Sequence, residues 1–215
     1  MPDKAETHDP ILPHFTKPNE IIPRITKETL VGVLNGSYGT LFSQIRIIDC
    51  RFQHEYNGGH IDQALNYDDD ARLTEWLFGS PEGGATLIFH CEYSVCRAPR
   101  IAGVVRDYDR RLNIDCYPNL LYENIYILDG GYRDFFASYP AWCSPRGYIR
   151  MADGQYWTTG LRQRLDRLKG RKRSSRSAWS PESNSIPPLR LNNKNIRQRG
   201  QETEMELKYG RNCDY

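Results

Sequence analysis

Residues 85–112 read ATLIFHCEYSVCRAPRIAGVVRDYDRRL. The run Ala85–Phe89 is short, apolar and partly β-branched, which is typical of a strand buried on both faces. From Ala98 to Leu112 the large apolar residues recur at helical spacing, and Pro99 fits a first helical turn, where no backbone donor is needed. The stretch therefore predicts a buried strand, a tight connection and a long amphipathic helix.

The same alternation of strands and helices continues on either side of this stretch. Thr26 is a suitable cap for a helix that ends at Asn35-Gly36, and Ile45–Asp49 is typical of a buried strand. A weak strand is expected at Ala64–Tyr67 and a further buried one at Ile125–Leu128. Short strands that alternate with helices predict an α/β domain, with a central parallel sheet and helices on both faces.

The composition divides the 215 residues into one domain and two ends. We predict a flexible N-terminal segment at 1–20, a folded domain at 21–157 and a basic, largely disordered C-terminal tail at 158–215. The tail has 14 Lys and Arg against 6 Asp and Glu, whereas the remainder has 15 against 21. An acidic body argues against nucleic-acid binding, and no apolar run approaches the ~18 residues of a membrane span.

Six cysteines are spread along the chain without a Cys-x-x-Cys pair, at positions 50, 91, 96, 116, 143 and 213. This spacing is typical of reduced thiols in an intracellular protein and favours neither a disulfide scaffold nor a zinc site. A dense basic run at residues 162–173 has the composition of a nuclear import signal or of a surface that docks an acidic partner. We expect a monomer that is present in the nucleus and the cytoplasm.

Cys91 and Arg97 form the candidate reactive site. A cysteine followed by five residues and an arginine (Cys-x5-Arg) is expected roughly 0.5 times by chance in a chain of this composition. The spacing alone is therefore weak evidence, and the surrounding elements carry the argument. In a parallel sheet, ligands bind at the carboxyl ends of strands, and a helix N-terminus there attracts anions. The partial positive charge of such a helix N-terminus also favours a Cys91 thiolate, and the planar guanidinium group of Arg97 can donate to two phosphate oxygens. We expect Cys91 to attack a phosphoryl group, giving a cysteinyl-phosphate that water hydrolyses. The connecting residues would bind the substrate: Glu92, Tyr93, Ser94, Val95, Cys96 and Arg97.

Several ordered blocks in residues 21–151 resemble the catalytic domain of the M-phase inducer phosphatases, dual-specificity enzymes that act on cyclin-dependent kinases. The blocks are Ile48-Asp49-Cys50-Arg51, Glu55-Tyr56, Gly58-Gly59-His60-Ile61, His90-Cys91-Glu92-Tyr93-Ser94, Arg97-Ala98-Pro99-Arg100, Tyr126-Ile127-Leu128 and Gly130-Gly131-Tyr132 with Phe135-Phe136. The resemblance implies a rhodanese-like three-layer fold and neither a metal nor an organic cofactor. It also implies a substrate kinase, bound to its cyclin and phosphorylated on adjacent Thr and Tyr, whose dephosphorylation promotes the onset of mitosis.

The loop departs from the resembling family at Cys96, where the family has Glu. Glu92 then remains as the candidate general acid of the loop, with a solvated carboxylate as the alternative; without an acid, the substrate must arrive as a monoanion. The cysteine matching Cys50 plays a redox-resolving role in the family. Cys50 and Cys91 both follow strands, so in a parallel sheet they reach the same edge, and Cys96 is a rival partner.

Other polar residues near these blocks are interpreted as structural. We expect backbone hydrogen bonds to hold His90, and His60 to have a structural role in a turn. Asp49 and Arg51 are expected to form a charge pair. Two other functions remain open at this point. One is an arsenate reductase of the same fold, and the other is a non-catalytic kinase-docking module. A sulfurtransferase is disfavoured because such enzymes resemble this fold but carry a shorter loop.

Overall fold

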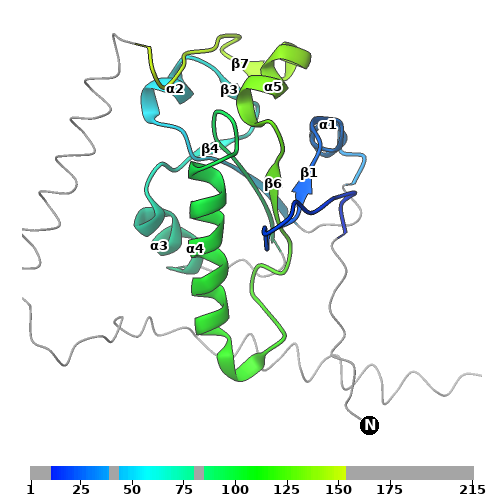
Figure 1. Cartoon of the computed structure of the whole chain (residues 1–215), viewed down its shortest axis with the longest axis vertical. Coiled ribbons are helices and arrows are strands. Elements are labelled where there is room, and N and C mark those ends of the chain that lie inside the picture. The colour runs from blue at the N-terminus through cyan, green and yellow to red at the C-terminus, as the bar shows by residue number, and fades with distance from the viewer. Residues whose placement is uncertain (1–10, 39–43, 80–84, 154–215) are drawn as a thin grey trace, which may run out of the picture. The chain divides into compact units, whose positions relative to one another are not determined.

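A five-stranded parallel sheet forms the centre of the computed structural model, which describes residues 11–38, 44–79 and 85–153 (Figure 1). The strand order is β1–β6–β5–β2–β4, and every neighbouring pair is parallel. The strands of this sheet are β1 (Arg24–Ile25), β2 (Gln44–Asp49), β4 (Leu65–Asn66), β5 (Ala85–His90) and β6 (Ile125–Leu128). A separate antiparallel pair consists of β3 (His60–Ile61) and β7 (Cys143–Ser144).

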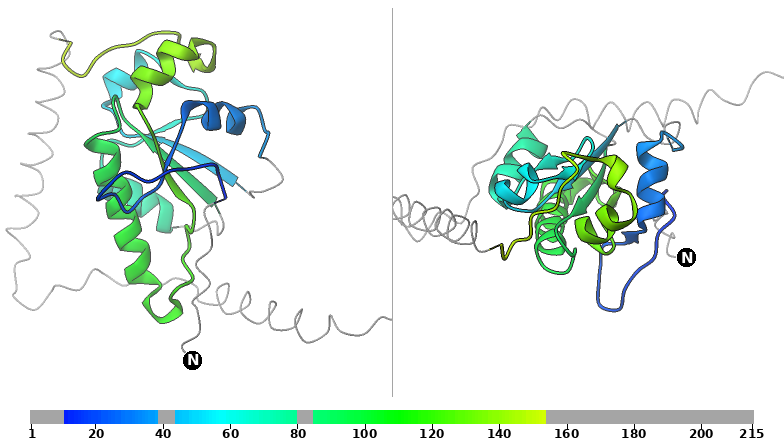
Figure 2. Two further views of the ribbon diagram at one scale, coloured as in Figure 1. Left: turned by 45° about the vertical axis from the view of Figure 1, so that its right-hand side comes forward. Right: turned by 90° about the horizontal axis from the view of Figure 1, so that it is seen from above.

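Helices cover both faces of the sheet, as the three-layer prediction requires (Figure 2). The described α-helices are α1 (Lys27–Leu34), α2 (Gln53–Asn57), α3 (Asp70–Gly79), α4 (Arg97–Leu112) and α5 (Gly131–Ser138), and the two short 3₁₀ helices are η1 (Ile114–Cys116) and η2 (Pro140–Trp142). Successive strand residues point to opposite faces. Ile48 and Phe89 pack with α3 and α4, whereas Ile47 and Ile88 pack with α1 and α5. The fold class is therefore confirmed.

The predicted elements are found close to their expected positions. Thr26 caps α1 and accepts a hydrogen bond from the Thr29 amide, and α1 ends before Asn35. The stretch 64–67 contributes only the two residues of β4, as its weak pattern indicated. Within the described ranges, no helix has both the length and the apolarity that crossing a membrane requires.

The prediction of a flexible segment at 1–20 is wrong for residues 11–20. Leu12 is buried and its amide donates to the Tyr126 hydroxyl, while Phe15 forms an antiparallel bridge with Arg24. Lys17 forms an ion pair with Asp129. Apolar burial and long-range contacts thus fix a segment whose prolines and charges alone suggest mobility. Residues 1–10 and the predicted tail at 158–215 lie outside the described residues.

Candidate active site

The register of the sheet brings the two candidate thiols to one edge. Asp49 of β2 lies opposite His90 of β5, so the next residues along, Cys50 and Cys91, emerge side by side. The Cys50 amide donates to the His90 carbonyl at 2.7 Å, which extends the ladder by one residue. Neighbouring strands lie about 4.8 Å apart, within the Cα separation that a disulfide spans. The sheet therefore places Cys50 next to Cys91, as predicted.

Three surrounding elements hold the backbone carbonyls of the loop between β5 and α4. The amides of Tyr132 and Arg133 in α5 donate to the carbonyls of Cys91 (2.9 Å) and Glu92 (3.1 Å). The carbonyl of Ser94 accepts from Nη2 of Arg24 at 2.9 Å. The carbonyl of Cys96 accepts from the Arg100 amide within the first turn of α4.

These anchored carbonyls determine where the loop amides point. In a trans peptide the N–H of the next residue is directed opposite to the carbonyl, and the cis peptides of the described chain lie elsewhere, at Tyr117-Pro118 and Ser144-Pro145. The N–H groups that follow the anchored carbonyls are therefore directed away from α5, β1 and the body of α4. They form a set of donors of the kind that binds a tetrahedral anion at a helix N-terminus.

Ser94 occupies a backbone conformation that most residues avoid. Its φ is +53°, in the left-handed region, and its side chain is buried. Its Oγ accepts a hydrogen bond from the Cys91 amide at 3.4 Å, across the loop. A small polar residue suits this position because it tolerates the left-handed region when its side chain bonds locally.

Gly131 allows the close approach of α5 to the loop. Its φ is +66°, and an added Cβ would lie 2.5 Å from the Cys91 carbonyl oxygen and 2.7 Å from that of Glu92. Both the conformation and the space therefore exclude a side chain. The preceding Gly130 also has a positive φ, +72°. The Gly130-Gly131 pair, which the sequence analysis names only as part of a resembling block, brings the amides of α5 to the loop carbonyls.

Arg97 is held by a carboxylate that the sequence analysis did not single out as functional. Its Nη1 and Nη2 atoms donate to the two carboxylate oxygens of Glu55, at 2.5 and 3.0 Å. Glu55 lies in α2, is fully buried and also accepts from the Phe52 amide. Burial opposes the charge of Arg97, but the hydrogen bonds and charge of Glu55 raise its pKa above the ordinary value. Two of the five guanidinium N–H groups thus bind Glu55, and the other three are not used by that carboxylate.

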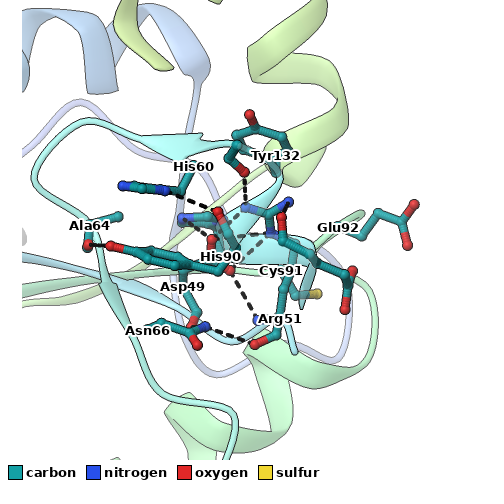
Figure 3. Close-up of polar contacts among 12 residues, drawn as sticks. Asp49, Arg51, His60, Ala64, Asn66, His90, Cys91, Glu92 and Tyr132 are labelled. Atoms are coloured by element: carbon teal, nitrogen blue, oxygen red, sulfur yellow. Dashed lines mark hydrogen bonds and ion pairs between the residues drawn. The ribbon is translucent and has the colours of Figure 1, made fainter. Parts of the chain in front are cut away.

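Glu92 is neither solvated nor directed into the loop. The carboxylate is buried; Oε1 accepts from the Tyr148 hydroxyl at 2.7 Å, and Oε2 accepts from the Met151 amide at 3.4 Å. Oε2 also lies 3.8 Å from Nη2 of Arg97. Figure 3 shows the Glu92 side chain extending away from the group around Asp49 and Arg51. The alternative of a solvated carboxylate is therefore wrong. Hydrogen bonds of the Glu92 side chain connect residues 148–151 to the loop.

A buried charge pair, formed by Arg51 and Asp49, supports the loop indirectly through Tyr132 of α5. Arg51 donates to both carboxylate oxygens of Asp49, at 2.6 Å for its shortest contact, and to the Gly59 carbonyl (Figure 3). Its guanidinium carbon also lies 3.8 Å from the ring centroid of Tyr132. Burial would raise the pKa of Asp49, but His90 and Arg51 hold it below the usual value. The predicted pairing of Asp49 with Arg51 is confirmed.

The two histidines have structural surroundings that differ in detail. His60 Nδ1 lies 3.0 Å from the Tyr56 carbonyl, and its ring stacks on that tyrosine. His90 is fully buried, and neither ring nitrogen has a hydrogen-bond partner in the described structure. The His90 carbonyl accepts from the Cys50 amide, and the Cys91 backbone acts on the ring and raises its pKa, so the expected backbone contacts are present although the ring makes no regular hydrogen bond. Its Nε2 lies 3.8 Å from Asp49, and burial lowers its pKa to about 4, so the ring is neutral at physiological pH.

The exposed rim of the loop is formed by Tyr93, Val95 and Cys96. Tyr93 is 44% exposed and Val95 69% exposed, and the Arg133 guanidinium lies over the Tyr93 ring. Cys96 is exposed at the first turn of α4, whereas Cys50 and Cys91 are buried. Burial first, and then the negative charge of a Cys91 thiolate, raise the pKa of Cys50 well above the usual value. Cys50 is therefore a neutral thiol beside Cys91.

The chain is similar in sequence to known proteins. Residues 36–138 match the family profile described as a rhodanese-like domain. The chain is 41% identical over 199 residues to an M-phase inducer phosphatase of Emericella nidulans, covering 89% of this chain and 36% of that protein. It is 39% identical over 156 residues to an M-phase inducer phosphatase of Schizosaccharomyces pombe, covering 72% of this chain and 26% of that protein. The chain thus spans about a third or less of the length of these two relatives.

Solved structures resemble the fold more distantly. A yeast protein tyrosine phosphatase of the rhodanese family superposes with a TM-score of 0.46 at 20% sequence identity, covering 59% of this chain and 92% of that one. A likeness at this level carries no information on activity.

Two glycines allow a matched test of the close approach between α5 and the loop. We expect Gly131→Ala to lower kcat/KM toward an aryl phosphate by at least a hundredfold, because the new Cβ displaces the carbonyls that orient the loop. Gly103→Ala lies within α4 with nothing within 4 Å of its Cβ. We expect it to keep full activity and to stabilise the protein by about 0.5–1 kcal/mol. Steady-state kinetics and urea unfolding measure both. Equal activity of the two variants would contradict the role given to Gly131.

Proposed function

We propose that this chain, which carries a rhodanese-like domain of the M-phase inducer phosphatase type, removes phosphate from tyrosine and threonine side chains of a protein. The observation that carries the proposal is the loop between β5 and α4. It places Cys91 at the carboxyl end of a buried strand and Arg97 at a helix N-terminus, with four carbonyls anchored on the outside. That arrangement suits the binding of a phosphate group directly in front of a nucleophile.

The proposed reaction has two displacements at phosphorus. The Cys91 thiolate attacks the phosphate, an S–P bond forms, and the P–O bond to the side-chain oxygen breaks. The N–H groups of the loop and of Arg97 stabilise the charge on the equatorial oxygens. Water then attacks the cysteinyl-phosphate, the S–P bond breaks, and inorganic phosphate leaves the regenerated thiolate. Neither step requires an oxidant, a reductant or a second substrate other than water.

The side-chain oxygen that leaves phosphorus must take up a proton. Glu92 already accepts hydrogen bonds from Tyr148 and Met151, so its oxygens are engaged outside the loop. Cys96, which stands where the resembling family has Glu, is exposed at the rim. We therefore propose that the substrate binds as its monoanion and carries the proton itself, in place of a general acid from Glu92.

The protein substrate and the surroundings of the enzyme are also proposals. The family name of the relatives supports a cell-cycle substrate, and we propose a cyclin-dependent kinase bound to its cyclin, whose dephosphorylation promotes mitosis. We further propose that the chain acts as a monomer in the nucleus and the cytoplasm, with the basic run at 162–173 in docking or nuclear import. Relatives named phosphatases favour this function over an arsenate reductase or a non-catalytic docking module.

The nucleophile and the arginine can be tested with aryl phosphates and phosphopeptides. We expect Cys91→Ser to abolish turnover, because a serine hydroxyl is not ionised at neutral pH. Arg97→Lys should lower kcat/KM by two or more orders of magnitude, because lysine cannot replace the planar fork. Phosphate release assays measure both. Cys116→Ser and Arg110→Lys change the same residue types away from the loop and should match the wild type. Activity retained by Cys91→Ser would contradict the proposal.

The basic tail can be tested by comparing a small substrate with a protein substrate. A chain ending at Gly160 should hydrolyse an aryl phosphate like the full chain but show a raised KM for a phosphorylated kinase–cyclin complex. The difference should be largest at low salt, because charge attraction is screened as ionic strength rises. Kinetics at 50 and 300 mM salt measure this effect. An unchanged KM for the kinase complex would remove the tail from docking.

The neighbouring Cys50 thiol is proposed to protect Cys91 from irreversible oxidation. Peroxide converts the Cys91 thiolate to a sulfenic acid, and the Cys50 thiol then displaces water to form a disulfide. After mild peroxide treatment, mass spectrometry should show a Cys50–Cys91 cross-link, and thiol reductant should restore activity. Cys50→Ser should recover poorly, whereas Cys143→Ser, which removes another buried thiol, should recover fully. A Cys91–Cys96 cross-link would contradict the role of Cys50.

A further inference from the structure

Arg24 is a buried arginine outside the loop whose side chain reaches the loop backbone. It lies in β1, is 2% exposed, and its Nη2 donates to the Ser94 carbonyl at 2.9 Å. Its main chain is held from both sides, because its amide and carbonyl pair with Phe15 and the preceding Pro23 carbonyl accepts from Ile127. The side chain therefore extends toward the loop from a fixed base.

The charge of Arg24 is already balanced by carboxylates. Glu20 accepts from Nε at 2.6 Å and from Nη2 at 2.8 Å, and Asp129 accepts from Nη1 at 3.0 Å. Asp129 immediately precedes Gly130-Gly131, whose helix anchors the first loop carbonyls, and Lys17 also pairs with it. Since both acids face Arg24, what it adds to the loop is a fixed hydrogen bond rather than net charge.

The bond from Arg24 fixes the peptide between Ser94 and Val95. With that carbonyl turned toward β1, the Val95 N–H is directed the opposite way, toward the side of the loop that receives the phosphate. Ser94 itself has a positive φ, a conformation that persists only when its surroundings hold it. We propose that Arg24 is a positioning residue that keeps the Val95 amide oriented as an oxyanion donor. This inference rests on the proposed function, since it assumes that the loop binds a tetrahedral oxyanion.

Binding of tungstate, an unreactive tetrahedral oxyanion, tests the proposal without turnover. We expect Arg24→Lys to raise the tungstate dissociation constant about tenfold, which corresponds to about 1.4 kcal/mol. Lysine keeps the charge but cannot bond Glu20, Asp129 and Ser94 together. Lys17→Gln removes only the exposed partner of Asp129 and should bind tungstate like the wild type. Calorimetry on the full chain measures the constants, and thermal unfolding reports whether each variant is folded.

The outcomes separate this proposal from the function itself. If the wild type binds no tungstate, the proposed function fails. If the wild type binds it and a folded Arg24→Lys binds it equally, only the role of Arg24 fails. If Arg24→Lys does not fold, nitrogen–proton NMR spectra of the wild type still test the proposal. The Val95 amide signal should move strongly during a tungstate titration, and a stationary Val95 signal among shifting loop signals would overturn the proposal.

Discussion

The hydrogen bonds that hold the loop carbonyls on its outer side are the constraint on which the rest of the site depends. A short loop that bends back on itself must direct either its carbonyls or its amides toward the centre. Here α5, β1 and the start of α4 each supply donors on the outside, at Tyr132, Arg24 and Arg100. The amides are left to face inward before any ligand arrives. In the proposed function, the binding of a phosphate group would then require little rearrangement of the loop, which is the condition for strong electrostatic stabilisation.

The surrounding fold maintains these donors through its own contacts. Gly131 allows the start of α5 to lie close to the loop, so the Tyr132 amide can donate to the Cys91 carbonyl. The Tyr132 ring packs on Arg51. Arg51 is paired with Asp49, which ends the strand beside β5. One chain of contacts thus runs from the sheet through a buried ion pair to the helix that anchors the loop. Loss of either Asp49 or Arg51 would leave the other charge buried and unpaired, which costs more than the contact itself contributes.

Much of the fold could be predicted from the sequence because the signals are local. Buried strands, the apolar stripe of α4 and the Thr26 cap each depend on residues a few positions apart. The same holds for Cys91 and Arg97, which stand at the two ends of one loop. Glu55 could not be predicted as the partner of Arg97, since 42 positions separate them and nothing in the short helix around Glu55 marks its carboxylate as buried. The outward path of Glu92 is a similar case, because it depends on Tyr148, 56 positions away.

The anchoring of the loop from β1 also bears on where this domain begins. The family profile starts at residue 36, after both β1 and α1. A boundary drawn there keeps every residue of the Cys-x5-Arg motif yet omits Arg24 and the chain that holds it. A recombinant fragment trimmed to the profile, or a protease cut in the preceding segment, would therefore leave the motif intact in sequence but without one of its outer supports. The contacts that hold the loop therefore begin upstream of the first residue that the family profile matches.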